Sequence, residues 1–311
     1  MLAEATQSES AISPPPVSEG IRIGDVSVCM HGLSAGNSRL DAGLQMFRHD
    51  ALQSDIDVSV EWVDKLQRRT ASPVFDSGAL WSLFSEGQSY IFDFFSASVC
   101  DSPYKQLRVD EKFRRAQLIL SRAALNAHRP VSPLEYPADE LLITNYLAHH
   151  ALGIEVHGCG IVDGEVGGNL FLGHSGAGKS TTTRLWQSVR DPEILSDDRI
   201  ILRLHGGELW MHGTPWHGEG QFASPGKSRI DKILILQHSN RNRITRIPRS
   251  RAAAELFARS FPPFHSPFGL QGTIDFLERV VHAIPCFEFG FIPDVHAVNA
   301  VLEMHHANVR C

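Results

Sequence analysis

The sequence lacks any apolar run long enough to cross a bilayer, since no stretch approaches the roughly 20 residues that a membrane helix needs. It also lacks an extended region of positive charge. The formal net charge is −6, and the lysines and arginines are scattered among the acids, which disfavours nucleic acid and anionic membranes as partners. The polar start, MLAEATQSES, has neither the basic nor the apolar region of a secretory signal. We therefore expect a soluble, cytoplasmic protein that binds neither nucleic acid nor membrane.

Cysteine is scarce and has no motif spacing. The five cysteines form an odd, widely spaced set without a CxxC pair: Cys29, Cys100, Cys159, Cys286 and Cys311. This pattern indicates neither a disulfide framework nor a zinc site, so we expect free thiols. With 311 residues, 42% of them hydrophobic, the chain can bury a sizeable core in one large or two ordinary domains.

Composition divides the chain into three regions. Residues 1–20 end in the proline-rich ISPPPVSEG and are expected to form a disordered tail. Residues 21–135 combine strand-like alternation in IRIGDVSVCMHG and DVSVEWVD, the β-prone SYIFDFFSASV, and helical spacing in DEKFRRAQLILSRAAL. They predict an α+β N-terminal domain of unknown role. Residues 136–311 open with PADELLITNYLAHHAL, a predicted helix, and form the second domain.

A phosphate-binding loop is the strongest motif. In FLGHSGAGKSTTTRLW (Phe171–Trp186) the loop is flanked by a predicted strand, NLFLG, and a predicted helix, STTTRLWQSV. Glycines let backbone N–H groups point at a phosphate, Lys179 neutralises the β and γ phosphates, and the Ser180 hydroxyl can ligate Mg²⁺. The predicted ATP-binding residues are Gly173, Ser175, Gly176, Ala177, Gly178, Lys179, Ser180 and Thr181.

The strand before this loop is expected to come from an antiparallel hairpin. IEVHGCGIV and NLFLG are separated by DGEVGG, a strong turn signal. If Val162 faces Asn169, His157 lies beside His174 and next to the transferred phosphate, although the register can slip by one residue. A hydrogen-bonded, half-buried strand histidine is an equal alternative for His157. For His174, a solvent-facing loop position is favoured over catalysis.

Two adjacent carboxylates follow the predicted P-loop helix. EILSDDRIIL places Asp197 and Asp198 immediately before a strand. One carboxylate can hold Mg²⁺ while the other accepts the proton of an attacking hydroxyl. In a sequence without a P-loop, two adjacent aspartates more often form a polar turn. Beside a P-loop, a catalytic role for the pair is favoured.

Five later segments are less specific. GTPWHGEG is either a glycine-rich loop that approaches a ligand or a surface turn with Trp216 packed inward, and the spacing of His212, His217 and Glu219 matches no metal-ligand pattern. The arginines between 241 and 251 are expected to form a solvated face, with contacts from one or two of them to nucleotide phosphates or an acidic acceptor as the alternative. DKILILQ and PCFEFGFIPD look like core strands, and FPPFHSPFG, which includes His265, is assigned to packing.

The order VHGCGIV, FLGHSGAGKST, LSDDRI and HGTPWHGEG resembles the catalytic domain of HPr serine kinase/phosphorylase. It is more similar to the HPr-kinase-like proteins that include the lasso-peptide precursor kinases, a group sharing its P-loop core with ATP-dependent phosphoenolpyruvate carboxykinase. The resemblance covers roughly residues 153–301. It implies that Lys179 binds the β and γ phosphates and that His157 lies near the reacting phosphate. It also implies that Asp197 and Asp198 divide the roles of general base and metal ligand; which does which stays open, with Ser180 and Asp198 as the candidate metal ligands.

The chain departs from that family after the aspartate pair. The family signature Glu-(Ile/Val)-Arg-Gly-x-Gly is replaced by LWMHGTPWHGEGQFASPG, where Glu219 and His217 are substitutes only on chemical grounds. The departure speaks against a phosphorylase reaction and against HPr itself as substrate.

The expected fold is α/β, with a mixed-sheet P-loop kinase domain of the HPr kinase and phosphoenolpyruvate carboxykinase type after a smaller α+β domain. The expected function is ATP- and Mg²⁺-dependent phosphorylation of a serine hydroxyl in a protein or peptide. Alternatives are a small-molecule kinase acting on free serine, a sugar or a carboxylate, and a regulatory ATPase without an acceptor. The oligomeric state stays open, with a homo-oligomer as one option.

Overall fold

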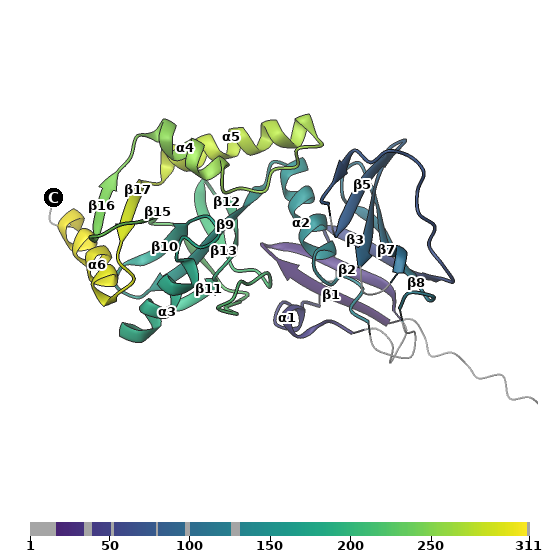
Figure 1. Ribbon diagram of the computed structural model, residues 1–311, viewed down its shortest axis with the longest axis horizontal. Helices are drawn as coiled ribbons and strands as arrows, with labels where there is room; N and C mark the ends of the chain where they lie inside the picture. Colours follow the sequence, from purple (N-terminus) through teal and green to yellow (C-terminus); the bar gives the residue numbers. More distant parts are fainter. Residues whose placement is uncertain are drawn as a thin grey trace, which may run out of the picture.

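Two mixed β-sheets organise the chain (Figure 1). The computed structural model describes residues 17–33, 39–50, 53–78, 80–96, 100–125 and 131–309. The first sheet has eight strands, β1 to β8, and the second has nine, β9 to β17, with helix α2 (Ala138–His149) between them in the chain. The protein is thus an α/β protein whose two sheets suggest two domains. The boundary expected after residue 135 stays a prediction.

The first sheet has the strand order β1-β2-β3-β8-β7-β6-β5-β4. Its strands are β1 (Val17–Ile23), β2 (Val26–Leu33), β3 (Ile56–Val63), β4 (Phe75–Asp76), β5 (Trp81–Glu86), β6 (Ser89–Ser96), β7 (Cys100–Asp110) and β8 (Arg115–Ser121). The short helix α1 (Ala42–Gln45) and helix α2 contribute buried side chains to the same core. The expected strands in IRIGDVSVCMHG, DVSVEWVD and SYIFDFFSASV are confirmed.

Two expectations for this region are wrong. The tail was expected to reach residue 20, but residues 17–20 belong to β1, which pairs with β2 through Glu19 opposite Met30 and Gly20 opposite Cys29; residues 1–16 lie outside the described residues. The helical spacing in DEKFRRAQLILSRAAL is also misleading, because residues 115–121 form β8 between β3 and β7. Alternate side chains of β8 enter the core there, so sheet pairing overrides the local pattern.

The second sheet runs in the order β14-β13-β12-β9-β10-β15-β17-β16, and β11 pairs with β9 beside this path. Its strands are β9 (Gly153–Asp163), β10 (Gly167–Leu172), β11 (Glu193–Ser196), β12 (Arg199–His205), β13 (Glu208–His212), β14 (Lys227–Arg229), β15 (Lys232–His238), β16 (Arg243–Arg246) and β17 (Cys286–Phe291). Its helices are α3 (Lys179–Val189), α4 (Arg249–Phe257), α5 (Pro267–Ala283) and α6 (Val295–Val309). The strands expected in DKILILQ and PCFEFGFIPD and the helix in STTTRLWQSV are confirmed.

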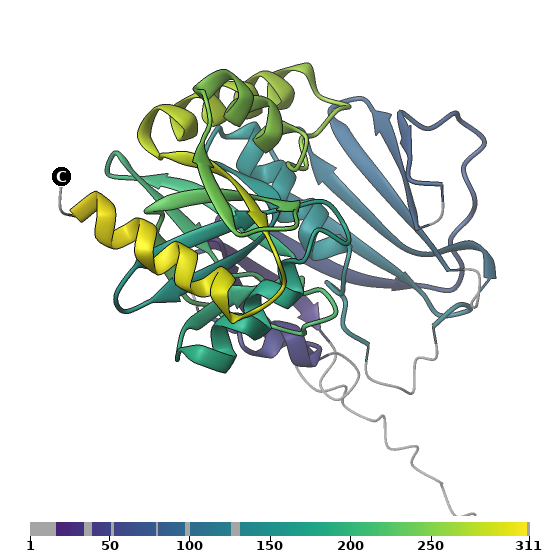
Figure 2. The ribbon, with the colours of Figure 1, turned by 60° about the vertical axis from the view of Figure 1, so that its left-hand side comes forward.

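Helices cover both faces of the second sheet (Figures 1 and 2). Because side chains alternate along a strand, Leu170 and Leu172 of β10 face the core that α4 and α5 close, whereas Phe171 faces α3 and α6. Trp186 of α3 packs against Phe171 with 6.3 Å between ring centroids. This packing holds the strand and the helix on either side of the glycine-rich loop 173–178.

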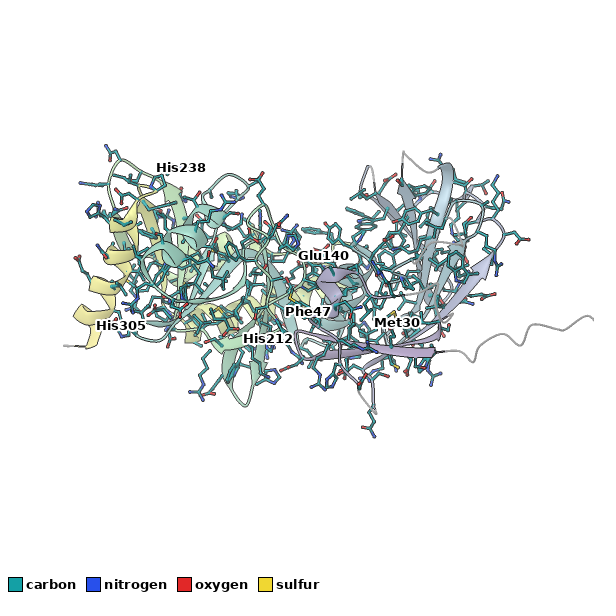
Figure 3. The ribbon with its side chains drawn as sticks, turned by 90° about the horizontal axis from the view of Figure 1, so that it is seen from below. Met30, Phe47, Glu140, His212, His238 and His305 are labelled. Carbon is teal, nitrogen blue, oxygen red and sulfur yellow. The ribbon has the colours of Figure 1, made fainter. Side chains whose placement is uncertain are left out.

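The two sheets are joined by specific contacts. The indole Nε1 of Trp216 donates to Asp139 of α2 at 2.8 Å, and Arg203 Nη1 donates to the Gly24 carbonyl at 2.7 Å. Trp216 and Ile201 also enter the core of the first sheet. Side chains such as Glu140 and His212 consequently lie where the two halves of the molecule meet (Figure 3).

Between residues 17 and 309, in the ranges that the structure describes, no helix is long and apolar enough to cross a membrane. Cys29, Cys159 and Cys286 are free thiols, as expected. Cys311 and the side chain of Cys100 lie outside the described residues.

Candidate functional site

The phosphate-binding motif forms the strand, loop and helix that were expected. β10 ends at Leu172, the loop follows, and α3 begins at Lys179. Gly176 and Gly178 have φ values of 78° and 100°, which only glycine adopts readily. A Cβ on Gly178 would also lie 2.5 Å from Cζ of Phe291. The loop conformation therefore requires glycine at position 178 on two independent grounds.

Lys179 is buried against the loop. Its ammonium group donates to the carbonyl oxygens of Gly173 at 3.0 Å and His174 at 3.2 Å. Burial lowers the pKa of Lys179, and the nearby carboxylates of Asp198 and Asp197 act in the opposite direction. The ammonium thus lies at the mouth of a loop whose helix presents its positive end, an arrangement suited to a polyphosphate.

The hairpin before the loop is confirmed, but its register differs by one residue from the expected one. Val162 pairs with Gly168 and Asn169 pairs with Ile161. The turn is tighter than expected because the Asp163 carboxylate accepts from the backbone N–H groups of the residues two and three positions later. His157 therefore lies opposite Gly173, and the Gly173 N–H donates to its carbonyl at 3.4 Å.

Asp197 is the centre of a hydrogen-bond network around the first turn of α3. Its carboxylate is fully buried and accepts from Ser180 Oγ at 2.9 Å, the Gly218 N–H at 2.9 Å and the Gly220 N–H at 2.8 Å. A Cβ on Gly220 would lie 2.5 Å from Asp197 Oδ2. The glycines of GTPWHGEG therefore allow backbone N–H groups to reach Asp197. The carboxylate beside Ser180 is that of Asp197, whereas the sequence paired Ser180 with Asp198.

Asp198 forms a dyad with His157 across neighbouring strands. His157 Nε2 lies 2.8 Å from Asp198 Oδ1, and Arg199 Nη1 donates to the other oxygen of the same carboxylate. Burial acts to raise the pKa of Asp198, but the His157 hydrogen bond and the charges of Arg199 and Lys179 outweigh it and lower that pKa. Asp198 is therefore ionised at neutral pH, the state that a general base requires.

A cavity of about 410 Å³ lies beside the loop. Its lining includes His174, Gly176, His238, Glu255 and Arg259. Arg259 is 4% exposed and pairs with the Glu255 carboxylate, and its carbonyl accepts from the His157 N–H at 2.6 Å.

Arg259 follows α4 and had no assigned role in the sequence, although a lone arginine after AAAELF was visible there. The arginines of the basic run are exposed, as expected for a solvated face: Arg241, Arg243, Arg246, Arg249 and Arg251. Arg259, outside that run, is the arginine that lines the cavity.

The remaining candidates separate into buried and exposed positions. His174 is exposed, as expected, and Trp216 packs inward. His217 and Glu219 are exposed, and the amides of Gly218 and Gly220 in the same loop reach Asp197. The structure thus assigns this loop to holding Asp197.

His212 lies in a group that the sequence did not indicate. Ligand atoms of Asp25, His205 and His212 lie within 4.8 Å of one another. Asp25 is already neutralised by Lys227, whose Nζ lies 2.7 Å from Oδ2. Burial lowers the pKa of His212 to about 4, so its imidazole is neutral at neutral pH. The group joins the turn between β1 and β2 to β12 and β13.

No protein-family model matches this sequence, and no curated protein sequence matches it.

Proposed function

We propose that the protein is an ATP-dependent kinase that transfers the γ-phosphoryl group to a serine hydroxyl of a protein or peptide. In this proposal residues 136–311 are a P-loop kinase domain of the HPr kinase and phosphoenolpyruvate carboxykinase type. The proposal rests on one observation. Beside the P-loop, the Asp197 carboxylate accepts a hydrogen bond from Ser180, and the neighbouring Asp198 carboxylate contacts His157.

The oxygen donors beside α3 suit Mg²⁺. Ser180 and Asp197 together present hydroxyl and carboxylate oxygens, the ligand types that this ion prefers. They would hold the Mg²⁺ that accompanies ATP, which neutralises phosphate charge when bound. Because two glycine N–H groups orient Asp197, the position of Ser180 is well defined.

Asp198 is suited to be the general base. Its carboxylate accepts the proton of the serine hydroxyl while the serine oxygen forms a bond to the γ phosphorus and the bond from that phosphorus to the β,γ-bridging oxygen breaks. ADP leaves with the electrons of that bond. His157 and Arg199 orient the carboxylate, and Lys179, the loop N–H groups and Arg259 stabilise the charge on the phosphoryl oxygens.

A general base can deprotonate a serine hydroxyl or an attacking water, so a transfer assay has to separate a kinase from a regulatory ATPase. The first test is transfer from γ-labelled ATP with Mg²⁺ into an extract separated into macromolecular and small-molecule fractions. We expect label in protein or peptide with the wild type and none with Lys179→Ala. Lys65→Ala, an exposed position in the first half of the chain, is the matched control. Label in a metabolite identifies a small-molecule kinase, and label only in free phosphate identifies an ATPase.

A further inference from the structure

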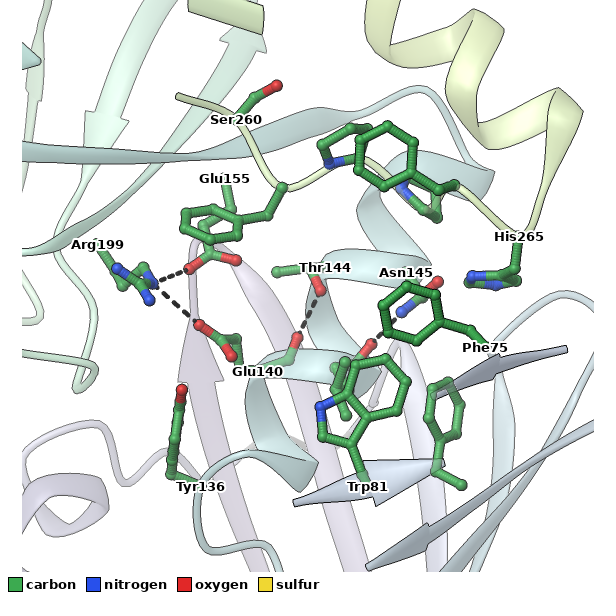
Figure 4. Close-up of a pocket in the computed structure, with 16 residues that line it drawn as sticks. Phe75, Trp81, Tyr136, Glu140, Thr144, Asn145, Glu155, Arg199, Ser260 and His265 are labelled. Carbon is green, nitrogen blue, oxygen red and sulfur yellow. Dashed lines mark hydrogen bonds and ion pairs between the residues drawn. The ribbon is translucent and has the colours of Figure 1, made fainter. Parts of the chain in front are cut away.

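A second cavity of about 300 Å³ lies between the two halves of the molecule (Figure 4). We call it the aromatic pocket, after the rings that line it: Phe75, Trp81, Phe92, Tyr136, Phe261 and Phe264. The segment FPPFHSPFG was assigned to packing, but Phe264 is 63% exposed and Phe261 is 41% exposed. Those two rings border the cavity and are not wholly taken up by the core.

One end of the aromatic pocket is acidic. Glu155 of β9 is 2% exposed, and among the described residues neither of its carboxylate oxygens accepts a well-formed hydrogen bond. Arg199 Nε lies 3.3 Å from Glu155 Oε1 and 3.2 Å from Glu140 Oε1. The same guanidinium also forms an ion pair with Asp198. One guanidinium is therefore shared by three acidic side chains, and burial together with the Glu140 charge raises the pKa of Glu155 well above its usual range. A bound cation would favour the ionised form of Glu155.

The other end carries no charge. His265 lies opposite Glu155 and Arg199 across the aromatic pocket (Figure 4), and its buried Nε2 has no hydrogen-bond partner among the described residues. Its ring packs edge-on against Tyr90 with 5.3 Å between centroids. Burial lowers the pKa of His265 to about 4. It is thus a neutral group that does not repel a cation at neutral pH.

The aromatic pocket adjoins the dyad. Tyr136 and Arg199 line it, and they also line a smaller cavity of about 270 Å³ that contains Asp198. Arg199 is the chain neighbour of Asp198 and contacts its carboxylate. A group held in the aromatic pocket therefore lies next to the proposed general base.

We propose that the aromatic pocket binds a basic side chain of the acceptor peptide, an arginine or lysine near the phosphorylated serine. Glu155 would supply the missing counter-charge, and the rings would contact the cation face-on and pack against its apolar stem. An acidic side chain would meet the carboxyl groups of Glu155 and Glu140, and the one guanidinium there, that of Arg199, already pairs with three acidic side chains, so the pocket would disfavour it. This inference rests on the proposed kinase function.

The test uses serine peptides in which one arginine is moved through each flanking position, with glutamine at the same positions as the neutral comparison. With γ-labelled ATP, we expect the wild type to prefer the best arginine peptide at least tenfold in kcat/KM, mainly through KM. Glu155→Gln should reduce that preference to less than threefold. Phe264→Ala should do the same, and because Phe264 is largely exposed, this substitution should leave the fold intact. Glu111→Gln, an exposed position in the turn after β7, should keep it. No basic preference, or a preference that survives in Glu155→Gln, overturns the proposal.

A binding measurement separates this inference from the kinase proposal. The best arginine peptide with alanine in place of the acceptor serine is titrated without ATP, and tryptophan fluorescence reports occupancy beside Trp81. Tighter binding to the wild type than to Glu155→Gln, with no label transferred to any peptide, supports the pocket and contradicts the serine kinase. Equal binding to both proteins overturns the pocket.

Discussion

Ser180, in the first turn of α3, donates a 2.9 Å hydrogen bond to Asp197, the first carboxylate of the Asp-Asp pair, while the second, Asp198, is held by His157. Adjacent residues with the same side chain therefore have different surroundings. Asp197 is fully buried and accepts three hydrogen bonds, whereas Asp198 lines a cavity. The roles that we propose for the two carboxylates, metal ligand for Asp197 and general base for Asp198, rest on these partners.

Asparagine substitutions should separate the two roles. Asp197→Asn places an amide N–H₂ group against hydrogen-bond donors, the Ser180 hydroxyl and the Gly218 and Gly220 N–H groups. Because it also removes a carboxylate ligand, it should raise the Mg²⁺ concentration needed for half-maximal activity about tenfold or more. Asp198→Asn should keep binding of Mg²⁺-ATP but lower kcat by roughly 10²–10⁴-fold, the range for loss of a general base. Mg²⁺ titrations and single-turnover transfer measure the two effects, and the reverse pattern would exchange the two assignments.

Gly178→Ala should impair ATP binding. Alanine at a φ of 100° is strained, and its methyl group would meet Phe291, so a loss of about 1–2 kcal/mol, or roughly tenfold in Kd for ATP, is the minimum expected. Gly164→Ala is the control, because a Cβ there meets no atom within 4 Å. Calorimetric titration with ATP measures both, and equal affinities would contradict the importance of this loop conformation.

Arg259→Ala should slow phosphoryl transfer by about 10²-fold or more if its guanidinium stabilises transferred charge. The change also leaves the Glu255 carboxylate without its partner in the same cavity, so Arg259→Ala is compared with the double variant Glu255→Gln and Arg259→Ala. Activity restored in the double variant would show that Glu255 repulsion caused the loss. Arg249→Ala, from the exposed run, is expected to keep wild-type kcat.

His265 should make stability fall in acid. Its folded-state pKa of about 4 lies below the ordinary 6.5 because of burial, so the unfolded chain binds the proton first as pH falls below 6.5. The stabilisation is fully present above pH 6.5 and is lost between 6.5 and 4, by up to about 3 kcal/mol. Urea unfolding of His265→Gln should show a smaller decline than the wild type over this window. His296→Gln, whose side chain is 75% exposed, should follow the wild type, and identical slopes for all three proteins would exclude the effect.

Local signals predicted the elements around the loop. Gly178 must be glycine because of its own φ, and Phe171 to Trp186 encode strand end, loop and helix within sixteen consecutive residues. The β9–β10 hairpin was predictable from its turn residues. Its register was not, because the side chain of Asp163 closes a shorter turn than composition indicated.

Contacts between distant parts of the chain make two of the sequence-based predictions wrong. Arg115–Ser121 has helical spacing, yet pairing with β3 and β7 makes it a strand. FPPFHSPFG looks like core material, yet Phe261 and Phe264 line a cavity. Neither outcome has a local cause, because each depends on which surface meets the segment.

The sequence by itself determined the conformation of the glycine-rich loop between β10 and α3, since glycine dihedrals, the helix end and Lys179 act within a few residues. Only the tertiary structure decided that Ser180 meets Asp197, that His157 meets Asp198, and that Glu155 shares Arg199 with Glu140. These partners come from different strands and helices, and hydrogen bonds and ion pairs act only over a few ångströms. Such contacts depend on sheet register and packing, which no single stretch of the chain specifies.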